Sequence, residues 1–362
     1  MRDDTATTPL TGTATGPTPY GMADIRMPEV CLPFPPHDPN PGLAQAETAL
    51  SAWLDAFAIC QSPASRRSLR RARIPLITAL AYPDAPPAVL ELLIQWATWS
   101  FIVDDEFEDG PDGDDPARCA AALATLLPML DGARPGELPS ARAFSGTLER
   151  LTDGRSPGWC RMLRHDIGAF LWSYYESLLD RLAHRIPTLP AYRRQRAVTV
   201  AGYTWLDLVE VAAGIDLPET VRHLSSFRDL RDAASEYVGF HNDLWTVAKD
   251  KAAGSFHNAV LLVQHHDHHT LQEAVDHVNG MLTDCAQRML SAERDLAVQL
   301  DAAGITGRSR ADALTCAEGY RKFVRACFDY HYQVDRYTTA DLDHTGERTP
   351  PFQLFQPVTP ST

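Results

Sequence analysis

Three features are scarce or missing in this 362-residue sequence, and each excludes a class of protein. No apolar run reaches the ~18–20 residues that a membrane-spanning helix needs, and the first residues lack the apolar core of a secretory signal peptide. The seven cysteines are scattered without a CxxC pair, which excludes zinc fingers and disulfide frameworks. Lys and Arg number 33 against 47 Asp and Glu, and the resulting charge of −14 disfavours nucleic acid and anionic membranes as partners. We expect a cytoplasmic protein with reduced thiols.

Alternating strand patterns are missing too, and helical periodicity runs through the chain from Leu43 onward. Residues 1–27 are rich in Thr, Pro and Gly and are expected to be disordered. Residues 341–362 are expected to form a flexible lid or a disordered tail. Between them we predict one all-α domain over residues 28–340. Beyond the first helices, the pattern predicts helices over 87–108, 116–131, 139–152, 157–184, 190–214, 218–250, 256–264, 271–302 and 308–337.

An acidic run follows a strongly apolar one in the first half of the chain. Eight of the twelve residues from Asp104 to Asp115 are acidic and none is basic, and LELLIQWATWSFIV stands just before them. Like charges at the end of a buried helix are costly unless a cation compensates them. Asp104 and Glu108 are four residues apart, so both side chains reach one point beyond the helix end. Mg²⁺ fits better than Ca²⁺, because an EF-hand loop would need Gly where Asp109 stands. A solvated acidic turn is the alternative.

A second polar pattern lies in FHNDLWTVAKDK, residues 240–251. Asn242, Thr246 and Asp250 recur every four residues and therefore share one helix face. Their amide, hydroxyl and carboxylate oxygens are three donors for Mg²⁺. Lys249 lies beside them and is placed to meet a phosphate. An exposed polar helix face would show the same pattern, so the triad by itself is weak evidence.

Taken together, the two patterns resemble those of bacterial class I terpene synthases. DDEFE at 104–108 is similar to the family's aspartate-rich DDxx(D/E) motif. NDLWTVAKD at 242–250, which begins 138 residues further on, is similar to its ND(L/I/V)x(S/T)xxx(E/D) motif. The likeness covers residues 28–337. Glu108 and Asp250 stand where Asp and Glu are commoner, and both keep the carboxylate.

Two further positions carry the resemblance. Arg336 and Tyr337 match an Arg-Tyr pair near the C-terminus of the family, and Arg196 matches its diphosphate-sensing arginine, 46 residues before the Asn of the triad. Thr199 and Val200 then fall at a helix break that follows this arginine. The conjunction of four motifs is highly specific.

The resemblance implies a helical bundle around a central apolar pocket, and an enzyme that ionises and cyclises a linear isoprenyl diphosphate. It implies Mg²⁺ as cofactor, three ions in the family, with Mn²⁺ as a possible substitute. Asp105 and Glu108 are expected to support or gate the site. The implied metal-site residues are Asp104, Glu108, Asn242, Thr246 and Asp250, and the implied diphosphate-binding residues are Arg196, Lys249, Arg336 and Tyr337.

The pocket of such an enzyme must be apolar and dry, because a nucleophile or base inside it would quench the carbocation. Aromatic faces are expected there, since they stabilise positive charge. Ordinary core packing is the alternative for each aromatic residue. The candidates are Trp96, Trp99, Phe101, Trp205, Tyr237, Phe328 and Tyr330, with Thr199 and Val200 at the helix break.

Several alternatives stay open. Farnesyl diphosphate (C15) is favoured over geranylgeranyl diphosphate (C20), and the chain is expected to be a monomer or a homodimer. A chain-elongating prenyl diphosphate synthase would need a second aspartate-rich motif in place of the triad. A non-catalytic helical protein that binds Mg²⁺ or lipid would release no diphosphate.

One pattern lies outside this interpretation. HHDHH at 265–269 is of the kind that binds transition metals. It falls between two predicted helices, and we expect a solvated loop there.

Overall fold

The computed structural model describes residues 25–337 and 354–355 of the chain. Helices make up all the regular structure of this part, which contains no β-strand, so the all-α prediction is confirmed. The expectations for residues 1–24, and for the C-terminal tail apart from Leu354 and Phe355, concern residues outside the described part. The helices are α1 (Leu43–Ala56), α2 (Pro63–Ala72), α3 (Ile74–Ala81), α4 (Pro87–Asp109), α5 (Pro116–Leu130), α6 (Pro139–Thr152), α7 (Pro157–Leu182), α8 (Leu189–Thr199), α9 (Gly202–Ala213), α10 (Glu219–Arg222), α11 (Ser225–Ala252), α12 (Ala259–His266), α13 (Leu271–Ala302), α14 (Gly307–Gln333) and the 3₁₀ helix η1 (Asp335–Tyr337).

Prolines and caps explain where the helices begin. Each helix from α2 to α8 has Pro at its first or second position, where the missing N–H costs nothing. Side chains of Ser62, Ser156 and Thr188 accept hydrogen bonds from the exposed N–H groups of the first turns of α2, α7 and α8. Thr270 forms a full capping box with Glu273 at the start of α13.

The predicted helix over 190–214 consists of two helices, α8 and α9, which are separated at Val200 and Ala201. Ala201 adopts a left-handed conformation with φ of 56°, which ends the helical ladder. Ser235 of α11 donates a 2.7 Å hydrogen bond to the Ala197 carbonyl beside the break. A Cβ on Gly202 would lie only 2.0 Å from the Ser235 hydroxyl oxygen, so the break packs directly on α11. The predicted helix over 218–250 is likewise two helices, α10 and α11.

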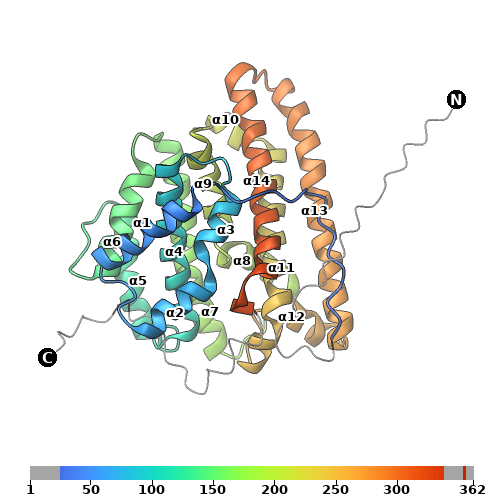
Figure 1. Ribbon diagram of the computed structural model, residues 1–362. Helices are drawn as coiled ribbons and strands as arrows, with labels where there is room; N and C mark the ends of the chain where they lie inside the picture. The colour runs from blue at the N-terminus through green and yellow to red at the C-terminus, as the bar shows by residue number, and fades with distance from the viewer. Residues whose placement is uncertain (1–24, 338–353, 356–362) are drawn as a thin grey trace.

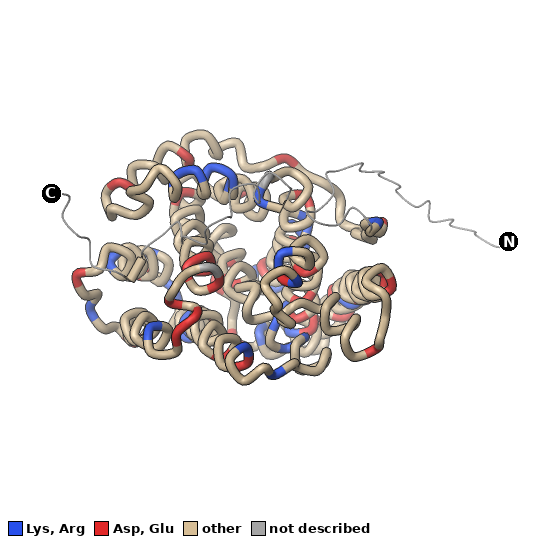
Figure 2. Tube along the Cα trace, turned by 90° about the horizontal axis from the view of Figure 1, so that it is seen from below, with Lys and Arg blue, Asp and Glu red and all other residues tan. Residues whose placement is uncertain are grey.

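The arrangement of the helices brings distant parts of the sequence together. Helix α14 runs through the middle of the bundle and ends, with η1, in the lower part of the view (Figure 1). Helix α11 packs along α13 and also contacts α8, α9 and α14, while α4 packs on α1, α3 and α6. In the view from below, backbone segments that carry Asp or Glu lie close to segments that carry Lys or Arg (Figure 2). Within residues 25–337, no helix has both the length and the apolarity needed to cross a bilayer.

Candidate active site

The last turns of α4 carry the acidic motif. Asp104 is half-buried, and its Oδ1 accepts a 2.8 Å hydrogen bond from the hydroxyl of Tyr174 on α7. Burial, followed by repulsion from Glu108 and Asp105, raises the pKa of Asp104 well above its ordinary value. The described residues therefore compensate the negative charge at this helix end only in part.

Two basic side chains from distant parts of the chain reach this acidic end. Arg336 of η1 forms a two-pronged ion pair with the buried Asp105, and its guanidinium lies 5.6 Å from the centre of the Phe101 ring. Lys249 of α11 places its Nζ 3.6 Å from Oε2 of the exposed Glu108. The acidic motif, the C-terminal arginine and the lysine of the second motif therefore meet at one place.

The acidic run does not act as a single cluster. Glu106 is fully buried, and burial followed by the nearby Asp112 raises its pKa to about 8. Asp112 in turn accepts a 2.9 Å hydrogen bond from Nε of Arg118. Glu106 thus belongs to a separate polar group, and the charge that the sequence concentrates in one run is divided between two places.

The second motif forms a partly open stripe on α11. Asn242, Thr246 and Asp250 are half-buried, and most of the residues between them are buried. The Thr246 hydroxyl donates to Oδ2 of Asp250 at 2.8 Å, and Nδ2 of Asn258, the N-cap of α12, donates to the same oxygen at 2.9 Å. Burial raises the pKa of Asp250 to about 6 despite these hydrogen bonds.

The orientation of the Asn242 amide follows from its two neighbours. Nδ1 of the buried His331 lies 2.6 Å from the Cys327 carbonyl, which can only accept, so this nitrogen carries the hydrogen. Burial lowers the pKa of His331 to about 4, so the ring is neutral and Nε2 accepts from Nδ2 of Asn242 at 3.2 Å. The Asn242 amide oxygen therefore faces the other way, where Nη2 of Arg196 donates to it at 2.6 Å.

Arg196 crosses from α8 to α11 through a gap left by a glycine. A Cβ on Gly239 would lie 2.8 Å from Cγ of Arg196. Nε of Arg196 donates to Oδ1 of the buried Asp243 at 2.9 Å, and Nη1 donates to the Thr199 hydroxyl at 3.3 Å. With the Asn242 contact, three of the five guanidinium N–H groups are engaged among the described residues, and two remain for an anion.

The predicted pocket residues divide into two groups by exposure. Four of them are partly exposed to solvent: Phe101, Thr199, Val200 and Phe328. Trp205 is 4% exposed and stacks on Tyr82 and Phe323. The other four, which are at most 1% exposed, have the surroundings of core residues: Trp96, Trp99, Tyr237 and Tyr330.

The two tryptophans of α4 are buried because they pack against α6. Trp99 stacks on Phe144 of α6 with ring centres 4.3 Å apart, and its indole N–H donates to the Ser140 carbonyl at 3.2 Å. Trp96 packs against the same Phe144 ring. Both side chains therefore fill the contact between α4 and α6.

Sequence reasoning missed three polar residues that hold the candidate ligands. Tyr174 and His331 come from α7 and α14, far along the chain from the groups they contact, and no local pattern marks them. Asn258 lies only eight residues after Asp250, and an Asn just before an apolar helix is a recognisable N-cap.

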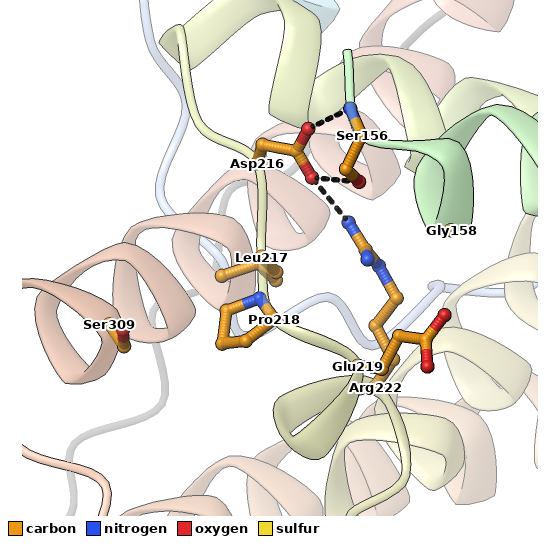
Figure 3. Close-up of a pocket in the computed structure, with 8 residues that line it drawn as sticks. All are labelled: Ser156, Gly158, Asp216, Leu217, Pro218, Glu219, Arg222 and Ser309. Carbon is orange, nitrogen blue, oxygen red and sulfur yellow. Dashed lines mark hydrogen bonds and ion pairs between the residues drawn. The ribbon is translucent and has the colours of Figure 1, made fainter.

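A cavity of about 460 Å³ lies elsewhere, between the starts of α7 and α14 and the segment around α10 (Figure 3). Asp216 and Arg222, which both line it, contact each other at 3.4 Å, and Asp216 also accepts hydrogen bonds from the backbone and hydroxyl of Ser156. None of its lining residues belongs to the two motifs.

The donor set of the two motifs fits a hard divalent cation. Asp104, Asn242, Thr246 and Asp250 supply only oxygen atoms, which is the ligand type of Mg²⁺. The raised pKa values of Asp104 and Asp250 indicate carboxylates that lack enough positive charge around them to offset their burial. A divalent cation between the two helices would supply it.

Comparison with known proteins points the same way. Residues 95–288 match the family described as terpene synthase family 2, C-terminal metal binding. A (2Z,6E)-hedycaryol synthase from Kitasatospora setae is 29% identical over 334 residues, 90% of this chain and 96% of that protein. A (+)-T-muurolol synthase from Roseiflexus castenholzii, named as (2E,6E)-farnesyl diphosphate cyclizing, is 29% identical over 232 residues, 64% of this chain and 71% of that protein. The solved structure of hedycaryol synthase in complex with HEPES matches with a TM-score of 0.76 and 28% identity, covering 85% of this chain and 98% of that one.

Proposed function

Because the chain belongs to the bacterial class I terpene synthases, which bind divalent metal, we propose that it uses Mg²⁺ to ionise and cyclise farnesyl diphosphate. The products are a cyclic terpene and diphosphate. The T-muurolol synthase, whose name states farnesyl diphosphate as substrate, supports the C15 chain length. Geranylgeranyl diphosphate is the second candidate substrate.

The proposed metal site uses Asp104 from α4 and the triad Asn242, Thr246 and Asp250 from α11, with Glu108 at its edge. Mg²⁺ ions bound there, three by analogy with the family and replaceable by Mn²⁺, supply positive charge that binds the diphosphate and stabilises it as a leaving group. His331 and Asn258 hold the amide and carboxylate oxygens of the triad in place before any ligand arrives.

Four basic or hydroxyl side chains are proposed to bind the diphosphate: Arg196, Lys249, Arg336 and Tyr337. The three cationic ones already contact the motifs, at Asp243, Glu108 and Asp105 respectively. The Tyr337 hydroxyl lies 3.5 Å from the Asn242 amide nitrogen. These contacts hold the four donors close to the two motifs, where negative charge would develop on the diphosphate.

The chemical step is cleavage of the allylic C–O bond. The electron pair of the bond leaves with the diphosphate oxygen, where the N–H groups of Arg196 and Arg336 stabilise the growing negative charge, and the prenyl chain becomes a carbocation. Phe101, which lies under the Arg336 guanidinium, and Phe328 are proposed to face this cation. Thr199 and Val200, at the break between α8 and α9, would close that end of the pocket and exclude water.

The observation that carries the proposal is the meeting of the two motifs, through the Lys249 contact with Glu108 and the Arg336 ion pair with Asp105. The test is to incubate the pure protein and Mg²⁺ with C10, C15 and C20 isoprenyl diphosphates and to identify the products by mass spectrometry. We expect a cyclic C15 hydrocarbon or alcohol, and none from an Asn242→Ala control.

Two results would contradict the proposal. No product and no released diphosphate from any substrate would indicate a non-catalytic protein. Longer diphosphates formed after addition of isopentenyl diphosphate would indicate a chain-elongating enzyme. A cyclic C20 product would retain the class of enzyme and overturn the choice of farnesyl diphosphate.

A further inference from the structure

The histidine-rich segment at the end of α12 and in the turn before α13 is not used by the proposed reaction. It contains four of the chain's thirteen histidines, His265, His266, His268 and His269, with Asp267 among them. The predicted loop over 265–269 is shorter than expected, because α12 continues to His266. The structure brings part of this segment together with His277, which lies about two turns into α13.

Three potential metal ligands converge there. One ligand atom each from Asp267, His269 and His277 lie within 4.8 Å of one another. The imidazole rings of His269 and His277 have their centres 6.2 Å apart. The capping box of Thr270 and Glu273 fixes the start of α13 and therefore the position of His277 relative to the loop.

The remaining histidines of the segment have other surroundings. Nε2 of His266 lies 2.9 Å from the Pro187 carbonyl, to which it donates a hydrogen bond. The His265 ring meets the exposed Phe256 ring edge-on, with centres 5.2 Å apart. His268 has a left-handed backbone, with φ of 54°, and is not part of the cluster. The cluster is therefore selected by the fold and not by histidine content alone.

We propose that Asp267, His269 and His277 form a second metal site, which binds Zn²⁺ or a similar transition-metal ion. Two imidazoles and a carboxylate suit Zn²⁺, which takes three protein ligands and a water in many sites, and they suit Mg²⁺ poorly. Ligands about 2.0–2.2 Å from Zn²⁺ in a tetrahedral site stand roughly 3.4 Å apart, so modest rotations of these accessible side chains would complete the site. A bound ion would join the loop to α13.

Zn²⁺ titration of the full chain against a chromophoric chelator tests this site, with Mg²⁺ in large excess to occupy the oxygen ligands of the active site. We expect one Zn²⁺ per chain, an affinity at least ~10-fold lower in His269→Ala and in His277→Ala, and less than ~2-fold lower in His268→Ala. At a free Zn²⁺ concentration ~100 times the Kd, the Tm of the wild type should rise by roughly 5 °C, and that of His277→Ala should not.

The matched variant His268→Ala separates a built site from a histidine-rich loop. An equal loss of affinity in His268→Ala and His277→Ala would overturn the proposal, because it would mean that the loop binds metal by composition. Unchanged binding in the His269→Ala, His277→Ala double variant would overturn it as well. All these positions lie outside the two motifs, so either result leaves the proposed terpene synthase activity unaffected.

Discussion

The two halves of the candidate active site are held in different ways. On α4, the carboxylates beside Asp104 have charged partners, because Asp105 pairs with Arg336 and the exposed Glu108 approaches Lys249. On α11, the triad is held mainly by uncharged groups, because the His331 ring fixes the amide of Asn242 and the Asn258 amide fixes Asp250. Arg196 is the charged exception, since it donates to the amide oxygen of Asn242.

This difference has a physical consequence. Uncharged hydrogen-bond partners fix the direction of a ligand atom without neutralising the negative charge that attracts a cation. The ion pair of Lys249 and Glu108 is exposed, so it is worth little and can be exchanged for metal or diphosphate. We infer that α11 is the preorganised half of the site and that the end of α4 is the half that rearranges when substrate binds.

Removal of one ligand from either half should have the largest effect. Asp104→Ala and Asn242→Ala should each reduce product formation at least ~100-fold, because each would remove one proposed oxygen ligand of the metal. Both positions are half-buried, so the free energy of unfolding should change by only about 1 kcal/mol. Mass spectrometry of the products and thermal melting check the two expectations. Near-wild-type turnover in one variant would mean that the helix carrying this residue does not contribute to the metal site.

The next effect concerns the arginine that joins the halves. Arg196→Lys keeps the charge but loses the planar fork that contacts Asp243 and Asn242, and it should reduce turnover at least ~10-fold. Arg193→Lys, on the same helix, is the matched control, since Arg193 pairs with Glu236 and should tolerate lysine. Steady-state rates of diphosphate release distinguish the two. Equal losses would indicate a general basic patch.

The hydrogen bond that holds the Asn242 amide can be removed without a change to any proposed metal ligand. His331→Phe keeps a ring at this buried position but loses the acceptor for the Asn242 amide, so half-saturation should require ~10-fold more Mg²⁺. His241→Phe is a matched control, because the His241 ring meets the His331 ring edge-on and makes no hydrogen bond to Asn242 in the described part of the chain. Rates measured across a Mg²⁺ series give the answer. If His331→Phe needs no more Mg²⁺ than the wild type and the His241→Phe control, the His331 ring does not position the Asn242 amide for metal binding.

The smallest effect on turnover is expected from two aromatic residues of α4. Phe101→Leu should alter the ratio of products, because Phe101 is partly open and lies beside Arg336. Trp99→Leu should lower the free energy of unfolding by about 2 kcal/mol and leave the product ratio unchanged, because Trp99 is packed against Phe144. Product profiles and denaturant melts measure both. The reverse pattern would place Trp99 in the pocket.

The sequence predicts some of these features for a clear reason. Positions i, i+4 and i+8 share a helix face whatever surrounds the helix, so the spacing predicts the common face of the triad. Its interpretation as a metal site depends on the resemblance to the family. The side of α4 that faces the pocket could not be predicted, because the run from Leu90 to Val103 is strongly apolar, and residues that line an apolar pocket have the same character as residues that pack in the core. The sequence alone therefore does not distinguish Trp96 and Trp99, which pack against Phe144, from residues that line a pocket.

Other features depend on contacts between distant segments. Tyr174 and His331 hold Asp104 and Asn242 from helices α7 and α14, and only the packing of the bundle brings them there. The left-handed Ala201 at the break between α8 and α9 has no glycine at that position to mark it in the sequence.

The central claim is that the two motifs form one site for metal and diphosphate, and calorimetric titration with inorganic diphosphate tests it most directly. The account predicts that diphosphate binds the wild type in the presence of Mg²⁺ but not without it, and that Asp104→Ala and Asn242→Ala each abolish the binding although they lie on different helices. Wild-type binding by either variant, or binding that does not depend on Mg²⁺, would contradict the claim.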